Sequence, residues 1–116
     1  MTKSLLEHSL EGNRDDLILK TIQDILTEVF GEKSFRKMRQ TMKQSYSLEW
    51  YEVPLKSDVF SSALRRILGS GSVIIEDLII ENLYSNLGLE LRWKKGFSFP
   101  DYIAQLPSSF GTVSQR

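Results

Sequence analysis

The first half of the chain predicts two amphipathic helices. Asn13 or Asp15 can cap the first, whose apolar positions follow helical spacing at Ile18, Ile22, Ile25, Leu26 and Val29. The glycine of Phe30-Gly31 ends this helix, because glycine adopts the left-handed conformation that other residues resist. A second helix begins near Ser34 and places one apolar stripe on Phe35, Met38, Met42 and Tyr46.

The second half repeats this pattern after Pro54. Ser57 or Asp58 can cap a third helix, whose apolar positions are Phe60, Ala63, Leu64, Ile67 and Leu68, and Gly69 ends it. Ser72 is positioned to cap a fourth helix of about residues 73–87. This helix is apolar over much of its circumference, which is typical of a central helix or of one in an oligomer interface.

Two shorter elements complete the predicted fold. Leu48 and Trp50 alternate with polar residues, as do residues 89–93 after the expected helix stop at Gly88, and such alternation predicts a two-stranded element. Pro100 and Asp101 can open a short helix, Tyr102 to Leu106, that Pro107 stops.

The fold class that follows is mainly α: a compact bundle of about four main helices from two repeated helical hairpins, with the two-stranded element and the short C-terminal helix as additions. We expect a lead-in at residues 1–13, a single helical domain at 14–106 with half-repeats 14–53 and 54–91, and a flexible tail at 107–116. The alternative to a repeat is two hairpins that look alike because glycine commonly ends helices.

Composition favours a soluble globular protein that lacks the usual catalytic residues. The 116 residues carry fifteen basic and fifteen acidic side chains, no cysteine and one histidine, His8. These counts exclude thiol chemistry and a multi-histidine metal site within one chain. Asp15-Asp16 and Glu76-Asp77 are expected in the first turns of helices, where carboxylates favour the helix dipole. We therefore expect no enzyme activity, no cofactor and no bound metal.

Residues 69–72 also do not form a P-loop, because this Gly-Ser-Gly-Ser run lacks the lysine. The apolar fourth helix is too short to cross a membrane, and the N-terminus lacks a secretory signal. Together these features predict a cytoplasmic protein with no membrane contact.

The second helix has a basic outer face, formed by Lys33, Arg36, Lys37, Arg39 and Lys43. At about 100° per residue, these cations lie opposite the apolar stripe or, in the case of Arg39, beside it. Such a face can bind phosphates, acidic protein surfaces or anionic lipid. The alternative is a solvated face whose charges pair with the acidic first and fourth helices.

Apolar and aromatic side chains supply two further hypotheses. Ile74, Ile80 and Tyr84 fall outside the main stripe of the fourth helix, so they form an exposed patch suited to a homodimer unless residues 1–13 or the C-terminal helix cover them. Trp50, Tyr51 and Trp93 lie near basic residues, a combination that can stack single-stranded bases, although aromatic residues at such positions more often close a core.

The second half also resembles the archaeal Nitrosopumilus output domain family. The matching residues and motifs are Phe60, the Leu68-Gly69 helix end, the Ile-Glu-x-Leu-Ile run at 75–79, and Leu83-Tyr84 before Leu87-Gly88. The resemblance covers the first half less closely, through Phe30-Gly31 and residues 42–48. It implies an accessory or output role in signal transduction and supplies no catalytic residue.

Two functions follow from these observations. The first is a non-enzymatic signal-transduction output or adaptor domain that acts through protein–protein contacts. The second is a small nucleic-acid-binding protein that uses the basic second helix, although zero net charge and the absence of a known recognition motif weigh against it.

Overall fold

The computed structural model describes residues 13–108 of the chain. Its first helical pair is α2 (Arg14–Phe30) and α3 (Glu32–Tyr46), and its second is α4 (Ser57–Leu68) and α5 (Ser72–Asn86). The short α6 (Phe99–Ala104) follows, and two 3-10 turns, η1 (Trp50–Glu52) and η2 (Gly69–Gly71), lie in the connections. The predicted mainly α fold is therefore confirmed. The predicted lead-in and tail lie largely outside the described residues.

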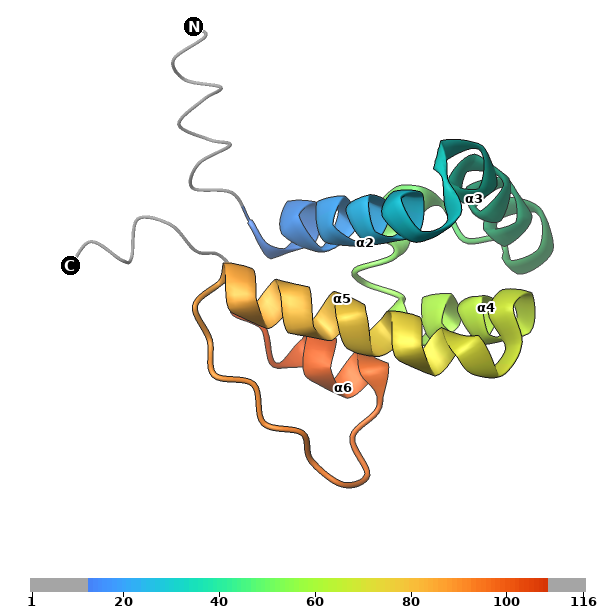
Figure 1. The fold of residues 1–116 in the computed structure, drawn as a ribbon. Helices are drawn as coiled ribbons and strands as arrows, with labels where there is room; N and C mark the ends of the chain where they lie inside the picture. Colours follow the sequence, from blue (N-terminus) through green and yellow to red (C-terminus); the bar gives the residue numbers. More distant parts are fainter. Residues whose placement is uncertain (1–12, 109–116) are drawn as a thin grey trace, which may run out of the picture.

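Helix α5 is the central element of the described fold (Figure 1). It packs against α2 on one side and against α4 and α6 on the other, while α3 packs on α2 and α4. The expectation that this apolar helix is central is confirmed. The helices bury one continuous core, whose most enclosed side chains include Ile18, Ile22, Leu26, Met42, Phe60, Leu64, Ile79, Ile80 and Leu83.

Capping explains where several helices begin and end. The Asn13 side chain accepts a hydrogen bond from the Asp16 N–H at 2.9 Å, as predicted for the start of α2. Gly31 ends that helix with a φ of +93°, and its N–H donates to the Thr27 carbonyl. At the end of α5, Gly88 has a φ of +69° and the Leu89 N–H donates to the Tyr84 carbonyl, the pattern of a Schellman motif.

Two predicted caps are wrong. Helix α4 begins at Ser57 after Lys56, with no side-chain cap, and Ser72 is already the first residue of α5. The reason at Ser72 is that η2 leads directly into α5, so Ser72 has helical backbone angles and its hydroxyl is buried. This hydroxyl has no hydrogen-bond partner among the described residues.

The predicted two-stranded element is also wrong for residues 13–108, where no strand is found. After α3 the chain turns at Ser47, which has a left-handed φ of +52°. It then forms η1, in which the Glu49 N–H donates to the Glu52 carboxylate at 3.0 Å. Residues 89–93 consequently have no strand to pair with, and they form an irregular loop.

Helix α6 confirms the predicted short C-terminal helix but begins earlier than expected. Ser98 and Asp101 form a capping box in which the Ser98 N–H donates to the Asp101 carboxylate at 2.8 Å. Beyond α6, Leu106 is buried in the core, and the Ser108 carbonyl accepts a hydrogen bond from the Arg14 N–H at 3.2 Å. The two ends of the described part therefore meet.

Candidate functional site

The five cations predicted on the second helix all lie on the exposed side of α3, and they are Lys33, Arg36, Lys37, Arg39 and Lys43. We call this set the basic face. Phe35, Met38 and Met42 on the other side of α3 are buried, so packing fixes which side of the helix faces outward. The predicted division of α3 into an apolar and a basic side is confirmed.

Few of these charges are neutralised by neighbouring acidic groups. Arg36 pairs with Glu32 one turn earlier at 3.4 Å, and Lys43 pairs with Glu49 at 3.8 Å. Lys33 and Lys37 form no ion pair within residues 13–108, and none of the ion pairs there joins α3 to α2 or α5. Exposed pairs of this kind contribute only about 0–1 kcal/mol, so a partner can replace them at little cost in free energy.

Arg39 connects the basic face to an aromatic pair. Its guanidinium carbon lies 5.1 Å from the centroid of the Trp50 ring and 5.9 Å from that of Phe35. The two rings meet edge to face with centroids 5.2 Å apart. Trp50 therefore contacts both Arg39 and Phe35, and these contacts occupy part of its ring.

Two of the three positions of the predicted apolar interface are covered by the C-terminal helix α6, which is one of the alternatives that the sequence left open. Ile80 is 1% exposed and Tyr84 is 6% exposed, because α6 packs over this part of α5. The Tyr84 hydroxyl donates a hydrogen bond to the Tyr102 carbonyl at 2.8 Å. Ile74 is 66% exposed, and its neighbour Val73 is exposed as well. These two side chains are the part of α5 that a homodimer contact could use, and this contact stays a prediction.

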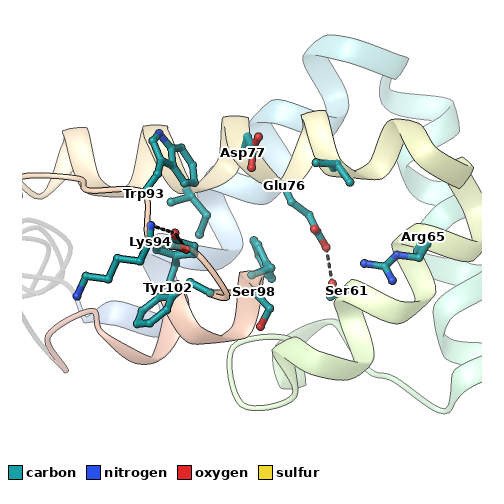
Figure 2. A pocket seen from close by; sticks show the side chains of 12 residues that line it. Ser61, Arg65, Glu76, Asp77, Trp93, Lys94, Ser98 and Tyr102 are labelled. Carbon is teal, nitrogen blue, oxygen red and sulfur yellow. Dashed lines mark hydrogen bonds between the residues drawn. The ribbon is translucent and has the colours of Figure 1, made fainter.

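A cleft that the sequence did not predict lies between α4, α5 and the segment from Trp93 to Tyr102 (Figure 2). Its volume is about 400 Å³, which falls within the range of roughly 300–1,000 Å³ that is usual for small-ligand pockets. Ser61 and Arg65 enter it from α4, and Glu76 and Asp77 enter it from α5.

Glu76 is the one charged side chain that is buried within residues 13–108, with 8% of its surface exposed. The Ser61 hydroxyl donates a hydrogen bond to its Oε2 atom. Burial raises the pKa of the Glu76 carboxyl; the hydrogen bond from Ser61 and the charge of Arg65 oppose this shift, while Asp77 adds to it.

The expectation that Glu76 belongs to the first turn of its helix is therefore wrong. Helix α5 begins at Ser72, so Glu76 lies beyond that turn, where the helix dipole stabilises a carboxylate less. A sequence signal was present: position 76 lies three and four residues before Ile79 and Ile80, which places it on the buried stripe. By contrast, Asp15 and Asp16 do lie in the first turn of α2.

The other side of the cleft is aromatic. The Tyr102 ring meets Trp93 and Phe97 edge to face, with centroid distances of 5.3 and 5.2 Å. The Tyr102 hydroxyl accepts a hydrogen bond from the Lys94 N–H at 2.8 Å, which fixes the loop against α6. Trp93 is 51% exposed, so part of its ring is available to a ligand.

The described part of the chain has neither a cluster of potential metal ligands nor a helix that could span a membrane. Between residues 13 and 108, no group of three or more histidine, cysteine, aspartate or glutamate side chains is placed to hold a metal ion. None of the helices described there has both the length and the apolar character needed to span a membrane.

Comparison with known proteins gives no match: no family model, no curated protein and no solved structure is significantly similar to this chain.

Proposed function

We propose that the protein is a non-enzymatic adaptor domain, of the signal-transduction output type, that binds an acidic segment of a partner protein in the cytoplasm. The observation that supports this proposal is the basic face of α3, where Lys33 and Lys37 project outward without an ion pair in the described residues. The buried stripe beneath the face holds the helix in place, so the backbone that carries the cations is preorganised.

A protein partner agrees better with the geometry than a nucleic acid does. Single-stranded nucleic acids are usually bound by a basic groove in which free aromatic faces stack on bases. Here Trp50, the tryptophan beside the basic face, is already covered by Arg39 and packed on Phe35.

The experiment compares two probes of equal charge: a fluorescein-labelled peptide of alternating glutamate and glycine, and a labelled oligothymidylate. Fluorescence anisotropy at several salt concentrations gives the affinity for each. We expect the peptide to bind, and we expect its binding to weaken as salt rises, because exposed ionic contacts are screened.

The variant that tests the site is Lys33→Gln with Lys37→Gln. Its matched control is Lys20→Gln with Lys56→Gln, which removes the same charge from lysines outside α3. The proposal requires the first variant to lose peptide affinity and the control to retain it. Equal losses in both variants would contradict a specific basic face, and tighter binding of the oligothymidylate than of the peptide would favour the nucleic-acid function instead.

A further inference from the structure

Packing does not explain why a glutamate, Glu76, is buried beside the cleft. It lies on the stripe of α5 that also holds Ile79, Ile80 and Leu83, where an apolar side chain would fill the core at lower cost. Removing a carboxylate from water is unfavourable unless a counter-ion or several hydrogen bonds replace the lost hydration. The residue at this position therefore serves another purpose than filling space.

No cation within the described residues contacts this carboxylate. None of the ion pairs found in residues 13–108 includes Glu76, and its one side-chain hydrogen bond comes from the neutral Ser61 hydroxyl. Arg65 points toward the pair from α4 (Figure 2) and influences Glu76 through its charge at longer range. Asp77, beside it on α5, has the same sign as Glu76. The carboxylate thus lacks a counter-ion in direct contact.

The aromatic side of the cleft suits a cation. Ring faces attract ammonium groups that lie within about 6 Å of their centroids. Lys94 shows this on the same loop, because its Nζ lies 5.0 Å from the centroid of Phe97. Its side chain extends away from Glu76 (Figure 2), so it leaves the space between the aromatic residues and the carboxylate open.

We propose that this cleft binds an alkylammonium group, carried by a lysine-like side chain or by a small free amine, with Glu76 as its counter-ion and Trp93 and Tyr102 as its aromatic wall. The ammonium donates hydrogen bonds to the carboxylate, and the alkyl chain packs on the exposed part of Trp93. No residue of α3 lines this cleft, so the site is independent of the basic face and of the function proposed for it.

The binding test uses n-butylammonium chloride as the probe and amide chemical shifts of the ¹⁵N-labelled full chain as the readout. n-Butanol, which has a similar shape and no charge, is the control for apolar contact. We expect n-butylammonium to shift the amides of Ser61, Asp77 and Lys94 with millimolar affinity, and n-butanol to shift them much less. Equal shifts with both probes, or none with n-butylammonium, would overturn the proposal.

A second titration distinguishes the two sources of the ammonium. Its probe is a blocked tripeptide with one lysine between glycines. Tighter binding of the tripeptide than of n-butylammonium identifies a segment of a partner protein, and the opposite order identifies a small free amine. Both orders support the ammonium site.

Two variants should change the affinity for n-butylammonium in opposite directions. Glu76→Gln keeps the shape and removes the charge, so binding should weaken by roughly tenfold or more. Arg65→Gln removes the competing cation, so binding should strengthen. Because Arg65 is exposed, this substitution should leave the fold unchanged. The control is Glu81→Gln, an exposed carboxylate of α5 outside the cleft, which should leave the affinity unchanged. Weaker binding in Arg65→Gln, or unchanged binding in Glu76→Gln, would show that the carboxylate is not the counter-ion.

Discussion

Ile74 and Ile80 allow a matched test of how α5 is covered, because they are the same residue on the same helix with opposite exposure. Ile80→Ala removes three buried carbons, which at about 0.8 kcal/mol each is roughly 2.4 kcal/mol of transfer free energy. The cavity left behind adds to this cost, and the better helix propensity of alanine offsets about 0.4 kcal/mol. We expect the free energy of unfolding to fall by about 2–4 kcal/mol. Ile74→Ala should change it by less than about 0.5 kcal/mol.

Urea unfolding followed by circular dichroism measures both variants. With a slope of about 2 kcal/mol per molar urea, Ile80→Ala should lower the midpoint by roughly 1–2 M, with the slope unchanged. The packing of α6 over α5 would be refuted if Ile80→Ala lost no more stability than Ile74→Ala. That result would return Ile80 to the exposed patch that its sequence position first suggested.

Three further variants test individual contacts. Tyr84→Phe removes the hydrogen bond to the Tyr102 carbonyl and should lower the free energy of unfolding by about 1 kcal/mol, measured by the same urea titration; a variant as stable as the parent would show that this bond contributes nothing net. Because the folded-state pKa of Glu76 lies above its ordinary value of 4.5, this carboxyl favours folding at low pH, and its contribution is lost as pH rises through the folded-state pKa. Glu76→Gln should therefore gain stability relative to the parent as thermal melts move from about pH 4 to pH 7, and a constant difference across this range would contradict the pKa shift. Ser47→Gly relieves a left-handed serine and should raise the free energy of unfolding by roughly 0.5 kcal/mol, since the strain removed exceeds the added freedom of the unfolded chain; a loss of stability in the urea titration would show that Ser47 is not strained.

The helices could be predicted because their periodicity and their stops are local signals. Asn13 lies directly before α2, and Gly31, Gly69 and Gly88 have the positive φ values that the helix ends require. The basic face could also be predicted from the sequence, because the rotation of about 100° per residue along a helix separates its cations from Phe35 and Met38.

The conformation of the segment after α3 was predicted wrongly, and the covering of α5 was left open. The alternation around Leu48 suggested a strand, but the Glu49 and Glu52 side chains and backbone favour a 3-10 turn there. Because the segment around Leu48 is not a strand, the loop after Gly88 has no strand to pair with and does not form one either. The sequence left open whether the C-terminal helix covers Ile80 and Tyr84, because the docking of α6, about twenty residues away, is not a local property.

The cleft was missed for a related reason. The spacing of position 76 to Ile79 and Ile80 places it on the buried stripe of α5, but the sequence did not show that this stripe borders a cleft. Only the joint placement of α4, α5 and the loop before α6 brings Ser61, Glu76 and Trp93 to one cleft.

The hydrogen bond between Arg14 and Ser108 has a consequence for protein engineering. Because the ends of the described part meet, residues 13–108 can be spliced into a surface loop of a host protein through short linkers, without forcing the host strands or helices apart.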